Sequence, residues 1–256
     1  MYHFFVPQDQ IGPERIFITG ADVNHIKNVL RMKPGEEIFV NDNVDKSFRC
    51  RIVEIESEVV WTEILDISLS KAELPAKLYL FQGLPKQEKM EWIIQKAVEL
   101  GAYQVIPVAT RRSVTKLDAK KAEAKVKRWN GIAEAGAKQS GRSVIPQVTQ
   151  VMSMREALEY GKDFDVKMIP YEKARGMEQT KTVMDKVRPG VQAGIFIGPE
   201  GGFEEAEIEE AVKAGFEPIS LGSRILRTET AGLAVLAVAM YQLETEARQV
   251  HEMESK

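Results

Sequence analysis

The motif Gly198-Pro199-Glu200-Gly201-Gly202 is the most informative stretch of this chain, together with a second glycine-bearing turn at Leu221-Gly222-Ser223-Arg224-Ile225-Leu226-Arg227-Thr228-Glu229-Thr230-Ala231. Each turn follows an apolar run typical of a strand and precedes a run typical of a helix. The carboxyl ends of neighbouring parallel strands meet at one edge of a sheet, where ligands bind in open α/β folds. The sequence therefore predicts a ligand site built from backbone groups and a few polar side chains of both turns.

Length and composition limit what the rest of the chain can be. The chain has 256 residues, of which 44% are hydrophobic, so it can bury a substantial core in one large or two modest domains. Its longest strongly apolar stretch, residues 231–240, is too short to span a bilayer. Residues 1–5 lack the basic start and the long apolar run of a signal peptide. These features predict a cytoplasmic globular protein.

Cysteine and histidine usage argues against a disulfide and against a structural metal. Cys50 is the single cysteine, which excludes an intramolecular disulfide. His3, His25 and His251 are isolated and lack the spacing of a zinc site. We therefore expect no metal. We also expect His25 to be a surface or domain-contact residue, because the sequence offers it no partner for acid–base chemistry.

Charge is distributed unevenly along the sequence, although the net charge is only -3. Residues 111–142 contain ten basic and three acidic side chains, whereas residues 200–256 contain twelve Glu and five Lys or Arg. A polyanion is therefore expected to bind the middle of the chain. A solvated helix face explains the same pattern, so charge alone leaves both interpretations open.

Residues 1–72 form the first expected domain. Short strand-like segments separated by turn signals are typical of a small β-barrel or sandwich. The expected strands are residues 3–6, 15–19, 37–41, 48–56 and 59–67. One helix is expected at residues 21–31, and its apolar face would hold Val23, Ile26, Val29 and Leu30. The polar segment 70–75 is the expected linker.

Residues 73–256 change to an alternation of strands and helices, which predicts an α/β domain with a largely parallel sheet covered by helices. The expected strands are residues 77–82, 104–109, 166–170, 193–197 and 217–220. The expected helices are residues 87–100, 118–139, 154–160, 204–214 and 228–246. The ligand crevice is expected at the carboxyl ends of these strands.

Several common α/β activities lack their motifs here. The second domain contains neither G-x-x-x-x-G-K-[ST] nor a G-x-G-x-x-G motif after its first strand. This absence argues against nucleotide hydrolysis and ordinary NAD chemistry. Ser223 lies in no G-x-S-x-G motif, and the histidines lie far from the glycine turns in sequence, which disfavours a serine hydrolase.

The two glycine turns resemble the signature of the SPOUT methyltransferases, specifically of the RsmE-type enzymes that methylate N3 of a uridine in 16S ribosomal RNA. Other stretches are similar to motifs of the same family. These are Gly83-Leu84-Pro85-Lys86, Lys89-Met90-Glu91-Trp92-Ile93-Ile94-Gln95-Lys96, Glu99-Leu100-Gly101, Arg111-Arg112-Ser113-Val114 and His25-Ile26-Lys27-Asn28-Val29-Leu30-Arg31. The resemblance runs over nearly the whole chain.

This resemblance implies a SPOUT α/β-knot domain, with a trefoil knot in its C-terminal part, and a small N-terminal PUA-like RNA-binding β-barrel. It implies that S-adenosylmethionine lies bent among three loops. Carried onto this sequence, the cofactor-binding residues are Pro170, Tyr171, Glu172, Ile197, Gly198, Pro199, Glu200, Gly201, Leu221, Gly222, Ile225, Leu226, Arg227 and Thr228. Glycines let backbone groups approach the adenine and ribose, while aliphatic side chains can line the adenine site.

The implied reaction needs positioning and a way to favour the anion of the uridine imide. A guanidinium beside O2 and O4 would stabilise that anion. We therefore expect Arg227 and Arg224 to be catalytic, with Glu229 orienting a neighbouring arginine or accepting a proton. A helix-terminal ion pair between Arg227 and Glu229, and an N-cap role for Thr228, are the alternatives.

RNA recognition must present a flipped or single-stranded uridine, because N3 is buried in a base pair. The expected RNA-binding residues are Arg31, Lys86, Lys89, Arg111, Arg112, Ser113, Gln139, Ser140 and Arg142. Trp92 and Trp129 could stack on bases, but both lie in helical patterns among apolar neighbours. We therefore expect both tryptophans to pack in the core.

The resemblance also implies partners. The RNA would be 16S ribosomal RNA in the small ribosomal subunit, and the protein would be a homodimer that uses the apolar helix at residues 231–243. Two alternatives stay open. One is a non-catalytic RNA-binding or ribosome-assembly factor, and the other is a SPOUT methyltransferase that acts on another RNA, such as a tRNA or a ribose hydroxyl.

Overall fold

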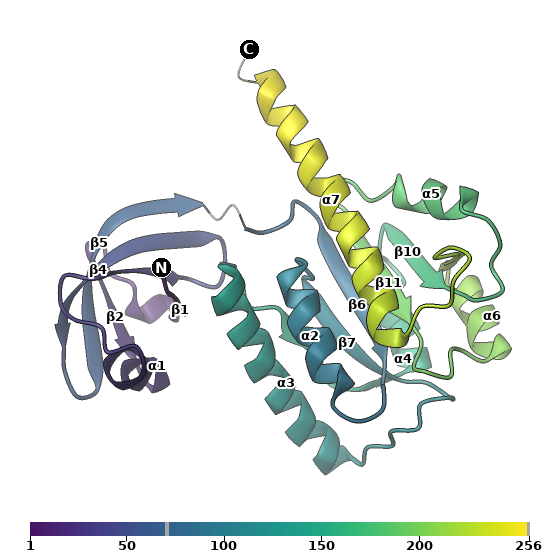
Figure 1. Cartoon of the computed structure of the whole chain (residues 1–256), viewed down its shortest axis with the longest axis horizontal. Coiled ribbons are helices and arrows are strands. Elements are labelled where there is room, and N and C mark those ends of the chain that lie inside the picture. Colours follow the sequence, from purple (N-terminus) through teal and green to yellow (C-terminus); the bar gives the residue numbers. More distant parts are fainter. Residues whose placement is uncertain (70–71, 255–256) are drawn as a thin grey trace. The chain divides into compact units, whose positions relative to one another are not determined.

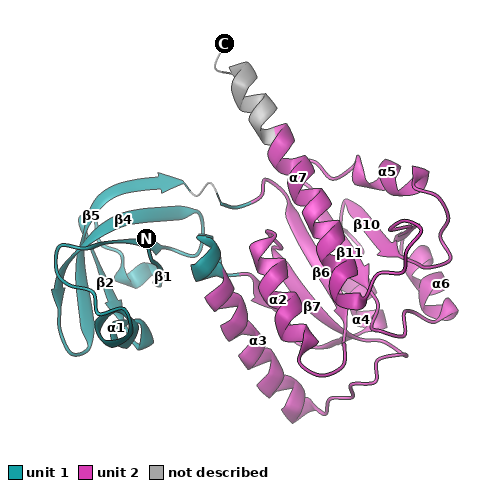
Figure 2. Cartoon of the chain, viewed as in Figure 1, with its two compact units in different colours: residues 1–73, 137–145 teal, residues 74–136, 146–256 magenta. Residues whose placement is uncertain are grey.

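A computed structural model describes residues 1–69 and 72–254, with side chains described as far as residue 246. Two compact units make up the chain (Figure 2). The first consists of Met1–Glu73 and Ala137–Ile145, and the second of Leu74–Gly136 and Pro146–Lys256. Ser70 and Lys71, at the start of the expected linker, lie outside the described residues.

The first unit is built on a curled five-stranded sheet with the strand order β1-β3-β4-β5-β2. Its strands are β1 (His3–Phe5), β2 (Arg15–Thr19), β3 (Glu37–Asn41), β4 (Lys46–Ile55) and β5 (Val59–Leu69). Neighbouring strands run antiparallel, except that β1 and β3 are parallel. Alternating residues such as Ile16, Ile18, Ile38 and Val40 are fully buried. The five expected strands are therefore confirmed.

The helix expected at residues 21–31 differs from the prediction. A single α-helical turn, α1 (Ala21–Asn24), continues as the wider π-helical turn η2 (His25–Val29). The amide of Leu30 donates to the carbonyl oxygen of His25 instead of that of Ile26. This widening rotates later side chains away from the expected face, so Val29 is 64% exposed whereas Ile26 is buried. His25 is exposed, as predicted.

Residues 137–145 join the first unit, which the contiguous ranges 1–72 and 73–256 did not include. Lys138 forms an ion pair with Asp22, with Nζ 2.8 Å from Oδ1. The guanidinium of Arg142 and the amide of Ser143 both donate to the carboxylate of Glu73. These charge-assisted contacts tie the end of a long helix to the β unit.

The second unit contains a parallel sheet with the strand order β12-β10-β11-β6-β7-β8, and the short strand β9 also pairs with β7. Its strands are β6 (Lys77–Gly83), β7 (Gln104–Ala109), β8 (Gln147–Val148), β9 (Met152–Ser153), β10 (Val166–Pro170), β11 (Gln192–Ile197) and β12 (Glu217–Ile219). Every one of these strand pairs is parallel. The predicted parallel α/β architecture is therefore confirmed.

Helices cover this sheet, where α2 and α7 lie side by side and α7 packs on β6 and β11 (Figure 1). The helices are α2 (Lys89–Glu99), α3 (Ala119–Ser140), α4 (Met154–Tyr160), α5 (Glu178–Met184), α6 (Glu205–Lys213) and α7 (Thr228–Glu254). A Cβ at Gly232 of α7 would lie 3.3 Å from Leu80 Cδ1, so this face of β6 is turned toward α7. Among the described residues, none belongs to a helix long and apolar enough to cross a membrane.

The opposite face of the sheet carries an aromatic core. Phe81 stacks on Phe196 with ring centroids 4.3 Å apart, and Phe216 packs edge-on against both.

Trp129 is buried, as predicted, but Trp92 is 47% exposed, so the expectation of core packing is wrong for that residue. It lies on α2 beside residues that are buried, and the periodicity of the helix alone did not separate it from them.

Candidate functional site

Three loops of the second unit enclose a cavity of about 830 Å³. They follow β10, β11 and β12, which are parallel neighbours, so their carboxyl ends meet at one edge of the sheet. Of the fourteen residues expected to bind a cofactor, the cavity wall includes every one except Gly201. Nine further wall residues were not predicted to bind the cofactor, which are Lys89, Lys173, Ala174, Arg175, Gly202, Phe203, Ser220, Ser223 and Ala231. All of these except Lys89 lie within three residues of a predicted cofactor-binding position, so extending each loop by a few residues would have found them.

The turn at residues 198–202 requires its glycines. A Cβ at Gly198 would lie 3.1 Å from the backbone of Gly202, which itself has a φ of 66°. The amide of Gly202 donates to the carbonyl oxygen of Pro199 at 2.9 Å and closes the turn. A Cβ at Gly83, at the end of β6, would approach Pro199 to 2.7 Å. The turn is therefore packed closely against the central strand of the sheet.

The loop between β12 and α7 presents bare backbone to the cavity. Gly222 has a φ of 102°, and no atom lies within 4 Å of the place that a Cβ would occupy. Ile225 is 93% exposed, although isoleucine side chains are usually buried. An open glycine backbone beside an exposed aliphatic side chain suits contact with a planar, partly apolar ligand.

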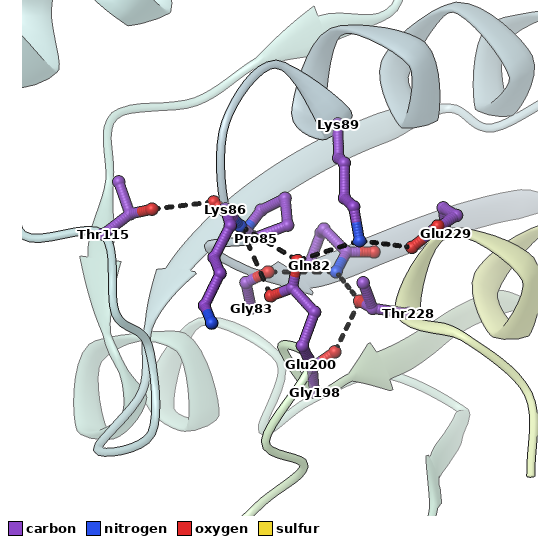
Figure 3. A network of polar contacts seen from close by, with 10 residues as sticks. All are labelled: Gln82, Gly83, Pro85, Lys86, Lys89, Thr115, Gly198, Glu200, Thr228 and Glu229. Atoms are coloured by element: carbon purple, nitrogen blue, oxygen red, sulfur yellow. Dashed lines mark hydrogen bonds and ion pairs between the residues drawn. The ribbon is translucent and has the colours of Figure 1, made fainter.

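Polar contacts join the two glycine loops to β6 (Figure 3). The hydroxyl of Thr228 donates to the carbonyl oxygen of Gly198 at 2.6 Å and accepts from Gln82 Nε2 at 2.9 Å. The amides of Thr230 and Ala231 donate to the carbonyl oxygen of Arg227, so Arg227 precedes the first turn of α7. The N-cap role considered for Thr228 is therefore wrong, because its hydroxyl is bonded to another loop.

An ion-pair network lies beside this bridge. Lys89 Nζ is 3.1 Å from Oε1 of Glu200 and 3.4 Å from Oε2 of Glu229 (Figure 3). Burial of Glu200 opposes its ionisation, but hydrogen bonds from its own amide, from Lys89 and from the amide of Lys86 outweigh burial and hold its pKa below the ordinary value. The hydrogen bond to Glu200 raises the pKa of Lys89. Both groups are therefore charged at neutral pH.

Arg224 and Arg227 both line the cavity and are exposed. Within the described part of the chain, neither arginine forms a hydrogen bond or an ion pair through its side chain. The alternative of an ion pair between Arg227 and Glu229 is therefore wrong, because Glu229 contacts Lys89 instead. Two uncompensated guanidinium groups at one cavity can stabilise an anion that forms there.

The residues expected to bind RNA are divided between the two units. Arg31, Gln139, Ser140 and Arg142 belong to the first unit, whereas Lys86, Lys89, Arg111, Arg112 and Ser113 belong to the second. Arg142 is only 3% exposed and bonded to Glu73, and Ser113 is 8% exposed and hydrogen-bonded to Thr110. Neither side chain is available to RNA, so the structure corrects both assignments.

Arg111 and Arg112 remain at the surface, but both contact the glycine turn or the helix that follows it. Arg111 forms an ion pair with Glu204 at 3.3 Å, and its amide donates to the buried carboxylate of Glu207 at 2.8 Å. Arg112 Nη1 donates to the carbonyl oxygen of Gly201 at 3.0 Å. The loop after β7 is therefore fixed against the turn at residues 198–202.

Comparison with known proteins agrees with this geometry. Residues 18–65 match the family model described as the RNA methyltransferase PUA domain. Residues 72–240 match the model described as the RNA methyltransferase domain. The fold and the cavity thus define an RNA methyltransferase with an N-terminal PUA domain.

The chain is 39% identical to Ribosomal RNA small subunit methyltransferase E of Bacillus subtilis, over 95% of this chain and 96% of the relative. The corresponding enzyme of Mesomycoplasma hyopneumoniae is 36% identical over 92% of this chain and 97% of the relative. A solved structure of the enzyme from Neisseria gonorrhoeae bound to S-adenosyl methionine superposes with a TM-score of 0.82 at 30% identity, over 94% of this chain and 98% of that chain. This chain belongs to the Ribosomal RNA small subunit methyltransferase E family. The expected SPOUT α/β-knot class with a PUA-like domain is thereby confirmed.

Proposed function

We propose that this protein transfers the methyl group of S-adenosylmethionine to N3 of uridine 1498 in 16S ribosomal RNA. Methylation of ribosomal RNA with this cofactor is the activity of the family, and the particular nitrogen and uridine are the finer part of the proposal. One observation carries it: two exposed guanidinium groups without partners in the described residues line the same cavity as the glycine loops. A ribosomal substrate implies a cytoplasmic protein.

The cavity has the size and the chemistry for this cofactor. Its volume of about 830 Å³ lies in the range of small-molecule sites, about 300–1,000 Å³. Ile197, Leu221 and Leu226 supply apolar walls for the adenine, and the open backbone of Gly222 supplies hydrogen-bonding groups. Charged side chains of both signs, such as Glu172 and Arg175, suit the zwitterionic methionine tail. The bound cofactor supplies an electrophilic methyl group on a sulfonium.

Arg227 and Arg224 are proposed to act on the uridine. Loss of the imide proton to solvent leaves negative charge on O2 and O4, and a guanidinium close to these oxygens lowers the energy of that anion. Arg227 is the stronger candidate, because its backbone carbonyl accepts the first hydrogen bonds of α7 and thereby fixes its place. Glu229 is held by Lys89, so we assign it a positioning role in place of proton acceptance.

RNA binding is proposed for the exposed members of the predicted set, which are Arg31, Lys86, Arg111, Arg112 and Gln139, and for the half-buried Ser140. We assign the PUA-like domain, residues 1–72, to RNA binding, and we assign catalysis together with further RNA contacts to residues 73–256. Phosphate contacts by arginine and lysine supply affinity, whereas a flipped base supplies the access that N3 requires.

A homodimer is also proposed, with α7 in its interface. Val238 and Tyr241 lie three residues apart on this helix and are 54% and 71% exposed. Side chains spaced in this way share one helix face, and large exposed apolar side chains are enriched at interfaces. Light scattering at micromolar concentration should give the mass of a dimer, and the substitution Tyr241→Asp should shift it toward the monomer. A wild-type monomer would contradict this proposal.

The direct test of the activity uses purified protein, small ribosomal subunits from a strain without the gene, and S-adenosylmethionine labelled on its methyl group. We expect label in 16S RNA as N3-methyluridine at one position. Label in another nucleoside would reject the proposed target. Binding of RNA without any transfer, in a protein that also fails to bind the cofactor, would indicate an RNA-binding assembly factor instead.

A further inference from the structure

Lys89, the first residue of α2, was expected to bind RNA, but its ammonium group lies between two carboxylates at the cavity (Figure 3). Nζ contacts Glu200 at 3.1 Å and Glu229 at 3.4 Å. The three side chains are largely buried, with exposed fractions of 19–29%. An ammonium group held by two carboxylates presents no net positive charge to a phosphate. The contacts of Lys89 therefore favour a role within the cavity.

The two carboxylates come from different segments, one from a cofactor loop and the other from the helix that follows the second cofactor loop. Glu200 belongs to the turn at residues 198–202, and Glu229 lies in the first turn of α7, two residues after Arg227. Lys89 belongs to neither segment. The ammonium group of Lys89 thus connects α2 to both the turn at residues 198–202 and the start of α7.

The segment that precedes Lys89 is itself fixed in place. The amide of Lys86 donates to both carboxylate oxygens of Glu200, at 3.1 and 3.3 Å. The hydroxyl of Thr115 donates to the carbonyl oxygen of Pro85 at 2.8 Å. The side chain of Lys86, by contrast, is exposed and forms no ion pair among the described residues. The loop before α2 is therefore hydrogen-bonded to two other segments, and it helps to fix the carboxylate of Glu200.

Electrostatics explains why a cation is needed at this place. Glu200 and Glu229 both contact the same ammonium group, so they are close enough to repel each other when it is removed. Repulsion would move the start of α7 away from the glycine turn, and with it Arg227 and the loop that contains Gly222. The positive charge of Lys89 therefore acts together with the Thr228 hydroxyl, which bonds the same two segments, in setting the width of the cavity.

We propose that Lys89 is a positioning residue of the cofactor site, which holds the turn at residues 198–202 and the start of α7 at the spacing that S-adenosylmethionine requires. Through Glu229 it also determines where Arg227 lies. The inference rests on the proposed function and deepens it, because it assigns Lys89 to the cofactor site in place of the RNA surface.

The test measures cofactor affinity without RNA, by isothermal titration calorimetry with S-adenosylmethionine. Lys89→Met keeps the unbranched aliphatic part of the side chain and removes the ammonium group, and we expect about fivefold weaker binding, the equivalent of one partly screened ion pair. Lys89→Arg should restore most of the affinity, because a guanidinium can bridge two carboxylates. Lys213→Met is the matched control, because Lys213 is an exposed lysine of α6 that forms no ion pair among the described residues and does not line the cavity, and this variant should bind the cofactor as the wild type does. Circular dichroism checks that each variant is folded.

Variants of the two acids separate positioning from direct contact with the cofactor. Glu200→Gln and Glu229→Gln should each weaken cofactor binding, and combining them with Lys89→Met should add less than the sum of the separate effects. Wild-type affinity in both glutamine variants, together with a loss in Lys89→Met, would mean that Lys89 touches the cofactor directly and would overturn the proposal.

RNA binding provides the other decisive readout. A phosphate contact by Lys89 would lower the slope of log affinity against log salt by about 0.7 to 1 in Lys89→Met. We expect that slope to be unchanged in Lys89→Met. A lower slope with wild-type cofactor affinity would return Lys89 to the RNA surface and overturn the proposal. A wild-type protein that binds no S-adenosylmethionine would reject the proposed function and this inference together, whereas equal binding by wild type and Lys89→Met would reject this inference alone.

Discussion

The hydroxyl of Thr228 donates a hydrogen bond of 2.6 Å to the carbonyl oxygen of Gly198, although thirty residues separate them in sequence. The same hydroxyl accepts from Gln82 of β6 at 2.9 Å. One side chain thus joins the glycine turn, the start of α7 and the central strand of the sheet. The two loops that the sequence singled out are therefore parts of one bonded unit.

Loss of this hydroxyl should weaken both stability and cofactor binding. Thr228→Val keeps the shape of the side chain but leaves Gln82 Nε2 and the carbonyl of Gly198 without this partner, at a cost of about 1–3 kcal/mol in the free energy of unfolding. Thr228→Ser retains the hydroxyl and should lose far less. Urea unfolding and calorimetry with S-adenosylmethionine measure the two effects. Equal stability and cofactor affinity in the valine and serine variants would show that the bridge is unimportant.

Gly222 should be essential for the cofactor and nearly dispensable for the fold. Gly222→Ala places a Cβ in the open space of the cavity and strains a backbone with a φ of 102°. This strain should lower the free energy of unfolding by about 1 kcal/mol. Gly190→Ala is the matched control, because its φ is 90° and its surroundings are equally open, but it does not line the cavity. Both variants should lose similar stability, and only Gly222→Ala should lose cofactor affinity. A similar affinity in both would place the cofactor away from this loop.

Arg227 should act on turnover more than on cofactor binding. Arg227→Ala is expected to lower kcat by about 10²–10³, the usual effect of removing one group that stabilises a developing anion. Arg224→Ala should have a smaller effect, and Arg155→Ala, an exposed arginine of α4 outside this cavity, should have none. Steady-state kinetics with small ribosomal subunits measures kcat, and calorimetry measures cofactor affinity. Full turnover by Arg227→Ala would remove it from the catalytic set.

The ion-pair network should be insensitive to pH over a wide range. The pKa of Glu200 is depressed below its ordinary value of 4.5, so its contribution to stability is present above that value and is lost as pH falls through the folded pKa. The pKa of Lys89 is raised above 10.5, so its contribution is present below that value and is lost as pH rises through the folded pKa. The difference in cofactor affinity between wild type and Lys89→Met should therefore be the same at pH 6 and pH 9. A difference that disappears within this range would contradict an ion pair between these groups.

The alternation of apolar residues and the positions of glycines predicted the strands and the place of the cavity, because both signals act over short stretches of sequence. The π-helical turn at His25–Val29 was not predictable in this way. A single shifted hydrogen bond changes which side chains face the core, and the composition of the segment does not reveal that shift. Trp92 and Trp129 looked alike in sequence, and only the packing of the helices exposes the first and buries the second. The seven-residue helix α5 was also missed.

Charged residues show the same limit more clearly. Arg142 and Lys89 each looked like a phosphate contact, because nothing in the sequence places Glu73, Glu200 or Glu229 beside them. Ion pairs between residues far apart in the chain depend on the fold and cannot be derived from composition. The free guanidinium of Arg227 was correctly located at the cavity, because it lies beside the glycine turn that forms the wall.

The most direct measurement maps N3-methyluridine in 16S RNA from a strain without this gene and from the same strain carrying the wild-type gene or Arg227→Ala. A methyl group on N3 blocks base pairing, so reverse transcription stops at the modified uridine, and mass spectrometry of the nucleosides identifies it. We predict that the mark at uridine 1498 is absent in the deletion strain, returns with the wild-type gene and does not return with Arg227→Ala. Persistence of the mark in the deletion strain would reject the proposed function.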